Sequence, residues 1–305
     1  MTTVIAITHE TLYKYRAPVE FAQHVAHLRP LEDSRQQVEA FEMTVDPAPS
    51  HHGTGPDAFG NSRVFFAVTQ PHKALAVRSA SRVRVAARPT ALAAYDTPPW
   101  EAVRERVRYA AGRPYEPAAQ FTPPSPYVPR LQALRELAEG CFPPGMPVAA
   151  GAVALMHRVH DEFTYESAST DVDTPLADVL AQRRGVCQDF AHAAIGALRM
   201  LGLPARYVSG YLLTDRNIVG ADASHAWVAA WCPGLTEGGD DWLELDPTNA
   251  VLPDTGHVRL AVGRDYGDVT PLRGVIRGGG GAHTLDVRVH TRRLEVGAKV
   301  AKEIS

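Results

Sequence analysis

Cys187, His225 and Asp246, in that order along the chain, have the residue types that thiol-based nucleophilic catalysis requires. In such a triad a cysteine attacks a carbonyl carbon, a histidine takes up the thiol proton, and a carboxylate orients the histidine and stabilises its charged form. Attack on an amide would form a thioester. The three residue types therefore predict acyl transfer or amide hydrolysis, if the fold brings them together.

The segment around Cys187 predicts a helix whose first turn contains the cysteine. Residues 183–203 begin with a turn signal at Gly185, continue with helical spacing, and end at Gly202 and Pro204. The spaced residues are Cys187, Ala191, Ala194, Ile195 and Leu198. The unpaired N–H groups and the helix dipole at this position favour a thiolate over a thiol. The alternative is that Cys187 is a small buried apolar residue, as most free cysteines are.

Two later segments predict the strands that would carry the other two residues. Residues 222–231 indicate a turn entering a strand, and residues 242–247 indicate a strand ended by proline. Opposed side chains on neighbouring antiparallel strands lie roughly 5 Å apart. His225 would lie opposite Asp246 if Ala229 lies opposite Trp242. Taken alone, His225 would more often be structural, and Asp246 could merely cap the turn that follows it.

Four sequence blocks resemble those of the bacterial transglutaminase-like cysteine peptidases. They are Gly-Val-Cys-Gln-Asp-Phe-Ala-His (185–192), Pro-Ala-Arg-Tyr-Val-Ser-Gly-Tyr-Leu (204–212), Ser-His-Ala-Trp (224–227) and Trp-Leu-Glu-Leu-Asp-Pro-Thr-Asn (242–249). Residues 13–19 and 57–61 also resemble the β domain that precedes the core in that family. The resemblance implies an α+β fold, with an N-terminal antiparallel β domain followed by a papain-like or transglutaminase-like α+β core. It also implies that Cys187, His225 and Asp246 act as nucleophile, base and orienting carboxylate.

The donors that would stabilise a developing oxyanion are less defined. The backbone N–H of Cys187 is the expected first donor, and Gln188 or Tyr165 could supply the second. Many transglutaminases use a tryptophan upstream of the cysteine for this purpose. Here the nearest preceding tryptophan is Trp100, which is too distant in sequence to be equated with it.

Two further residues of the cysteine block, Asp189 and His192, match the family pattern. Since they lie one turn into the predicted helix, we expect them to support the site or to pack rather than to react. Cys141 and Cys232 have no partner signature and are expected to be inert.

Composition and patterning divide the chain into four segments. Residues 1–92 predict the N-terminal β domain, because alternation with period two occurs at 5–15, 41–45, 64–68 and 75–85. Residues 93–130 are a proline-rich connector with a short helix around 100–109, and 131–270 are the catalytic core. Residues 271–305 are a glycine-rich connector followed by a C-terminal strand at 285–289.

Within the core, the pattern predicts helices at 131–139, 148–163 and from Thr174-Pro175 to about 183, where the threonine would cap the helix. Residues 163–165 are a short extended piece. A strand is expected at 205–213, with a β-bulge at Ser209-Gly210.

The overall composition excludes several classes of protein. The chain has 305 residues, 45% hydrophobic and 21% charged, with 31 Lys and Arg against 34 Asp and Glu. This near balance gives no reason to expect nucleic acid or a membrane surface as partner. The N-terminus lacks the features of a signal peptide, and no apolar run approaches 18 residues, so we expect a cytoplasmic protein without a transmembrane helix.

No metal or other cofactor is expected. The three cysteines are widely spaced and contain no Cys-x-x-Cys, and His24, His27, His51 and His52 lack a second cluster of ligands. Residues 55–62 lack the lysine of a phosphate-binding loop, and no helix follows the glycines at 278–281.

Two functions from different classes remain open. The first is an enzyme that cleaves a peptide or isopeptide bond of a peptide or protein substrate. Protein-glutamine transamidation, which cross-links proteins, is the alternative outcome, because the choice depends on whether the acyl-enzyme is shielded from water. The second function is that of a non-catalytic binding protein that retains the fold. The oligomeric state cannot be inferred from the sequence.

Overall fold

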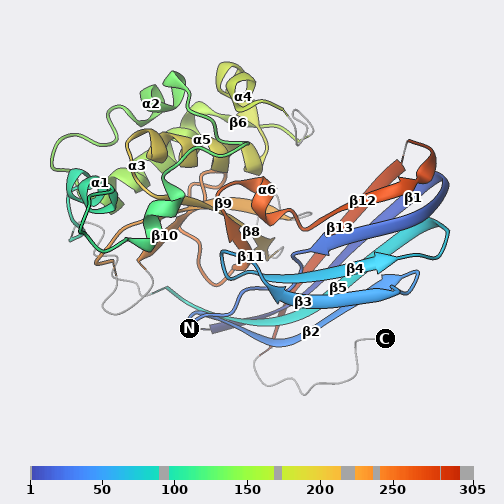
Figure 1. Cartoon of the computed structure of the whole chain (residues 1–305). Helices are drawn as coiled ribbons and strands as arrows, with labels where there is room; N and C mark the ends of the chain where they lie inside the picture. Colours follow the sequence, from blue (N-terminus) through green and yellow to red (C-terminus); the bar gives the residue numbers. More distant parts are fainter. Residues whose placement is uncertain are drawn as a thin grey trace.

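The structure is a computed structural model that describes residues 2–88, 96–167, 174–213, 224–235, 241–281 and 283–295. It combines a large curled antiparallel sheet with a layer of helices on a smaller sheet (Figure 1). None of the helices in these ranges is long and apolar enough to cross a membrane.

The large sheet contains seven strands and includes both ends of the described chain. Its order is β2-β5-β1-β4-β3, and β12 and β13 also pair with β1. The strands are β1 (Thr2–Ala26), β2 (Gln36–Asp46), β3 (His51–Pro56), β4 (Ser62–Val68), β5 (His72–Ala86), β12 (Leu272–Gly278) and β13 (His283–Leu294). The strands predicted from alternation at 5–15, 41–45, 64–68 and 75–85 are confirmed, whereas β3 and β12 were not expected.

The long strand β1 is the centre of this sheet. Residues up to Tyr15 pair with β5 on one side and β13 on the other, and residues from Val19 pair with β4 and β12. Register shifts between Lys14 and Val19 separate the two halves, so the strand changes partners there and the sheet curls. The segment 271–305 therefore contributes two strands, joined by the short η2 (Gly279–Gly281), to the same sheet as the N-terminus.

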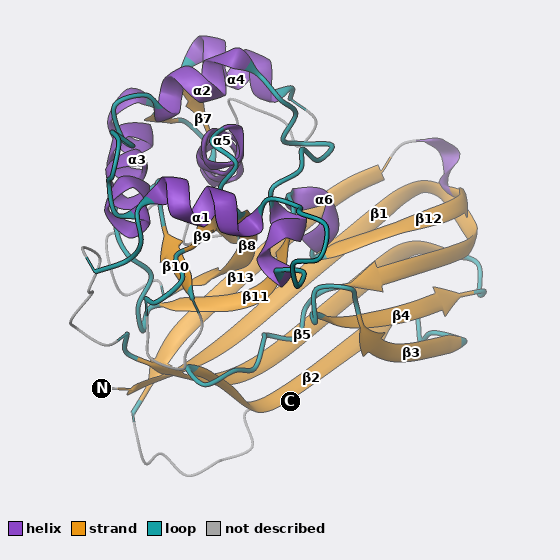
Figure 2. Cartoon of the chain, turned by 60° about the vertical axis from the view of Figure 1, so that its left-hand side comes forward, coloured by secondary structure: helices purple, strands orange, loops and turns teal. Residues whose placement is uncertain are grey.

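The core consists of helices packed on a four-stranded antiparallel sheet of order β10-β9-β8-β11 (Figure 2). Its strands are β8 (Ala205–Leu212), β9 (His225–Trp231), β10 (Trp242–Leu245) and β11 (His257–Gly263), and β6 (Thr164–Tyr165) and β7 (Arg184–Gly185) form a separate short pair. The helices are α1 (Trp100–Val107), η1 (Pro117–Phe121), α2 (Gln132–Ala138), α3 (Val148–Glu162), α4 (Leu176–Gln182), α5 (Cys187–Met200) and α6 (Tyr266–Val269). The predicted core helices and strands are confirmed in type, and β11 and α6 were not expected.

The proline-rich segment packs as part of this core. The short helix expected at 100–109 is α1, and buried Val103, Val107 and Ala118 belong to the same apolar cluster as the buried face of α5. This segment therefore packs against the core helices and is part of the core rather than a separate connector.

Two local predictions in the core are wrong. Pro175, not Thr174, occupies the N-cap position of α4, which begins at Leu176. The β-bulge lies in β11 at Leu260, since Arg259 pairs with Gly210 and Ala261 with Ser209. Gly210 is required for a different reason: a Cβ at this position would lie 2.2 Å from the Val258 carbonyl oxygen and 2.3 Å from the Trp227 ring.

The large sheet is joined to the core through two side-chain amides that bind the free edge of β11. Gln36 donates to the Arg259 carbonyl at 2.7 Å and accepts from the Arg259 N–H at 2.8 Å. Asn61 makes the same pair of bonds with Val262, at 2.7 and 2.8 Å. Asn61 is itself held by Asp57, which accounts for the 57–61 block. Together with the Leu31 N–H, which donates to the Arg259 carbonyl at 3.1 Å, the two amides therefore take the place of a neighbouring strand at this edge.

Replacing Gln36 by alanine is expected to lower the free energy of unfolding by about 1–3 kcal/mol, because the buried Arg259 N–H loses its acceptor. The matched control is Gln37→Ala, next to it but exposed, which should change stability by less than about 0.5 kcal/mol. Urea unfolding followed by tryptophan fluorescence measures both. Equal midpoints would show that the two parts are held together without the Gln36 contacts.

Candidate active site

Cys187 is the first residue of α5, and its neighbours fix where this helix begins. Val186 is the N-cap, and its backbone N–H donates to Asp189 Oδ2 at 2.9 Å. A side chain at position 185 would collide with that carboxylate, since a Cβ on Gly185 would lie 2.5 Å from Asp189 Oδ2. The sequence from Gly185 to Asp189 therefore fixes the start of the helix and leaves Cys187 half-buried at its positive end. Asp189 is 3% exposed and has this structural role at the helix start.

His225 and Asp246 meet at one end of the core sheet. His225 is the first residue of β9, Asp246 follows β10, and the Nε2 and Oδ2 atoms are 2.9 Å apart. Both side chains are fully buried. The register assumed from the sequence is wrong: Ala229 lies opposite Glu244, not Trp242. Asp246 thus reaches His225 diagonally, at a spacing that longer side chains bridge.

Asp246 is surrounded by hydrogen-bond donors. Its Oδ1 accepts from the backbone N–H groups of Thr248 and Asn249, at 3.0 and 3.2 Å. Its Oδ2 accepts from Asn249 Nδ2 at 2.9 Å and contacts the Nε2 atoms of His225 and His257, at 2.9 and 3.2 Å. Burial alone would raise the pKa of Asp246, but His225 and these hydrogen bonds hold it well below its usual range. The carboxylate is therefore ionised and can only accept hydrogen bonds.

Cys187 is the second group that interacts with His225. Burial opposes the charged form of this histidine, but Asp246 and then a hydrogen bond and charge interaction with Cys187 raise the pKa of His225 to about 10. Because Nε2 is bound to Asp246, the buried Nδ1, which has no other hydrogen-bond partner among the described residues, is the nitrogen left for the thiol. The three residues predicted from the sequence are thus neighbours in the order Cys187, His225, Asp246.

The other predicted site residues differ in position. Tyr165 in β6 is half-buried, and its pKa is raised by burial and by nearby Cys187, which places it beside the thiol. Gln188 is the second residue of α5 and is half-buried. His192 has packing contacts: its ring lies against Tyr207 with centroids 5.1 Å apart, and it accepts from the Tyr266 N–H at 3.2 Å. Burial lowers the pKa of His192 to about 3, so it stays neutral.

Two residues of the site were missed in the sequence. Tyr207 in β8 is fully buried, and its pKa is raised well above the usual value, first by burial and then by Cys187. It lies within the 204–212 block, in the strand that the sequence predicts there. His257 contacts Asp246 from β11, a strand that was not expected. In the sequence, each is marked only by being a polar residue at the start or in the middle of an apolar run.

The histidines considered as metal ligands have other positions. His24 stacks on Phe66 with centroids 5.1 Å apart, His27 Nδ1 lies 3.1 Å from the Thr270 carbonyl oxygen, and His51 and His52 are exposed. Within the described ranges, no group of three or more His, Cys, Asp or Glu side chains is arranged to hold a metal ion.

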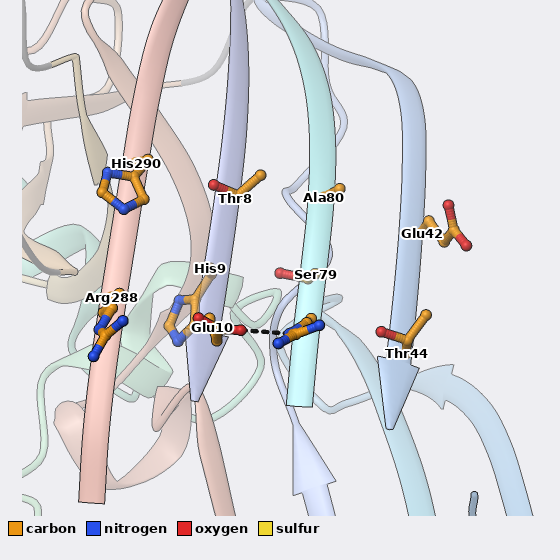
Figure 3. A pocket seen from close by; sticks show the side chains of 10 residues that line it. Thr8, His9, Glu10, Glu42, Thr44, Ser79, Ala80, Arg288 and His290 are labelled. Carbon is orange, nitrogen blue, oxygen red and sulfur yellow. Dashed lines mark hydrogen bonds and ion pairs between the residues drawn. The ribbon is translucent and has the colours of Figure 1, made fainter. Parts of the chain in front are cut away.

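A groove of about 460 Å³ lies on the large sheet rather than at Cys187 (Figure 3). Its walls come from β1, β2, β5 and β13, and Glu10 and Arg78 within it form an ion pair. Cys187, His225 and Asp246 are not among its lining residues.

Comparison with known proteins identifies the family. Residues 135–247 match the transglutaminase-like superfamily model, and residues 5–84 match the model of the bacterial transglutaminase-like N-terminal region. The chain therefore belongs to the transglutaminase-like superfamily and carries the bacterial form of the N-terminal region.

Several relatives extend over nearly the whole chain. Uncharacterized proteins of Mycobacterium tuberculosis and Mycobacterium bovis are 40% identical over 294 residues, covering 93% of this chain and 90% of their own length. A protein-glutamine gamma-glutamyltransferase of Pseudomonas aeruginosa is 35% identical over 137 residues, which are 41% of this chain and 19% of that protein. The crystal structure of a proposed cysteine protease from Cytophaga hutchinsonii has the same fold, with a TM-score of 0.71 at 21% identity, over 97% of this chain and 92% of that one.

Proposed function

We propose that this protein is a thiol-dependent amide hydrolase in which Cys187 forms a thioester with the acyl part of a peptide or isopeptide substrate. The observation that carries the proposal is the buried His225–Asp246 pair, 2.9 Å apart, whose remaining ring nitrogen is left for Cys187 at the start of α5. Such an arrangement is costly to bury, and it is expected where a nucleophile needs a base of fixed orientation.

In the proposed reaction, Asp246 accepts the Nε2–H of His225 and so leaves Nδ1 to take the thiol proton. The Cys187 sulfur forms a bond to the carbonyl carbon, and the charge that develops on the oxygen is stabilised by the Cys187 N–H. Tyr165 or Gln188 is the candidate second donor. His225 then gives its proton to the leaving amine, and water attacks the thioester to release the acid.

Transamidation is the second candidate, and the relative from Pseudomonas aeruginosa is the observation that favours it. In that case an amine, rather than water, attacks the same thioester. Cys187, His225 and Asp246 keep the same roles. The two proposed reactions therefore differ only in the molecule that attacks the thioester.

An activated thiol should be alkylated by iodoacetamide near pH 6 at least about tenfold faster than an ordinary buried thiol. Cys141 and Cys232 provide internal controls, because burial raises the pKa of both thiols. Mass spectrometry of peptides containing each cysteine gives the three rates. Equal rates, or a rate at Cys187 that is unchanged by His225→Ala, would overturn the thiol mechanism and leave the non-catalytic alternative.

Incubation with a peptide library containing lysine and glutamine then separates the two enzymatic outcomes. Hydrolysis gives shortened or deamidated peptides, whereas transamidation gives cross-linked peptides with loss of ammonia. Cys187→Ala protein is the control for contaminating activity.

A further inference from the structure

Asp246 is shared by two histidines. The same oxygen, Oδ2, lies 2.9 Å from His225 Nε2 and 3.2 Å from His257 Nε2. Since the carboxylate is ionised and accepts only, both Nε2 atoms carry a hydrogen and donate it. The proposed mechanism uses His225 and leaves the second donor, His257, without an assigned purpose.

The core sheet is built to bring His257 to this carboxylate. β8 lies between β9 and β11, so a side chain on β11 has to pass over β8 to reach Asp246. Gly210 of β8 pairs with His225 on one side and with Arg259 on the other, and it has no side chain to block the passage. The Trp227 ring lies over Gly210 and meets the His257 ring edge-on, with centroids 5.4 Å apart.

The position of His257 is fixed from both sides. Its backbone N–H donates to the Asp254 carbonyl at 2.9 Å, and its side chain is 6% exposed. Two residues further along, the backbone of Arg259 is bound by Gln36 from the large sheet. The N-terminal part of the chain therefore holds the strand on which His257 lies.

Asp246 is the charged group that His257 contacts directly, and the His225 ring lies 6.4 Å away. Arg259, on the same strand, is paired with Asp33 and Glu244. The Nε2–H of His257 therefore binds the same oxygen that stabilises the His225 imidazolium.

We propose that His257 is a positioning residue of this thiol site that acts through Asp246. Its Nε2–H holds Oδ2 toward His225 and so keeps the other ring nitrogen of His225 available to Cys187. This inference rests on the proposed function, because it assigns a purpose to His257 only if Cys187 is an activated nucleophile.

The test is the rate of Cys187 alkylation by iodoacetamide near pH 6 in the full-length protein, compared between two variants. His257→Gln keeps an N–H donor near the same place and should keep the wild-type rate within about threefold. His257→Met fills a similar space without a donor and should lower the rate by about tenfold. The matched control is His290→Gln, on the exposed side of β13, which should keep the wild-type rate. Urea unfolding midpoints measure the stability of each variant separately from its reactivity.

The proposal is overturned if folded His257→Met reacts at the wild-type rate, or if folded His257→Gln loses as much rate as His257→Met. If His257→Met fails to fold, a loss of rate of about tenfold in folded His257→Gln overturns the proposal alone. Failure of the proposed function has a different signature. In that case wild-type Cys187 reacts no faster than Cys141, or His225→Ala leaves its rate unchanged. A fast, His225-dependent wild-type thiol with an unchanged rate in His257→Met would remove only the role of His257.

Discussion

A Cys187→Ser variant is expected to fold and bind substrate while losing about a thousandfold or more of its turnover. A serine hydroxyl is much less acidic than a thiol, so neither the start of α5 nor His225 can ionise it to a comparable degree. The variant is close in size to the wild type, and the residue is only half-buried, so the fold should be retained. Turnover is measured on a peptide identified in the library experiment.

Cys187→Ala should abolish labelling and turnover together. Its stability should be nearly unchanged or slightly raised, because the substitution removes the strain that a reactive site imposes on the fold. Cys141→Ala is the control for general effects of removing a cysteine, since Cys141 belongs to the apolar core cluster. Wild-type turnover in either Cys187 variant would show that another residue is the nucleophile.

Replacing Asp246 by asparagine is expected to lower turnover by about 10³–10⁴-fold. The Thr248 and Asn249 N–H groups would still require an acceptor, so the asparagine carbonyl should occupy the Oδ1 position. Its amide NH2 would then face His225 Nε2. The histidine can accept from this group only by moving its own proton to Nδ1, the nitrogen that has to receive the thiol proton. The alkylation rate of Cys187 near pH 6 should fall in parallel with turnover.

The same substitution should also change the response of stability to acid. The depressed pKa of Asp246 means that its contribution to stability is present above the unfolded pKa of about 4 and is lost as pH falls below it. Wild-type protein should therefore lose more stability than Asp246→Asn on going from neutral pH toward pH 2, as measured by thermal unfolding. Asp286→Asn, at an exposed position of β13, is the control. Parallel pH curves for all three proteins, or full turnover in Asp246→Asn, would contradict the assigned role.

The residues of the candidate site could be named from the sequence because each lies in a short block with its own pattern. Cys187 begins a helix with clear apolar spacing, and His225 and Asp246 lie at the ends of two strands. The strand register could not be predicted in the same way. The observed pairing of Ala229 with Glu244 differs by two residues from the assumed one, and a shift of two keeps every side chain on its original face.

His257 and β12 were missed for physical reasons that differ. All seven residues of β11 are buried, so the strand shows no alternation between polar and apolar positions. In β12 only Leu272 is buried and the following residues are exposed, so its pairing with β1 rests mainly on backbone hydrogen bonds. Patterns of burial carry little information on either kind of strand, and long-range pairing is not encoded in any local block.

The double pairing of β1 has a consequence for the order of events during synthesis. β1 precedes the core in the chain and leaves the ribosome before it, whereas its partners β12 and β13 follow the core. Until they emerge, one edge of β1 offers unpaired backbone groups along most of its length, a state that favours association with other nascent chains. The large sheet is thus completed only after the thiol-bearing core has been synthesised, so its assembly depends on pairing between segments far apart in the chain.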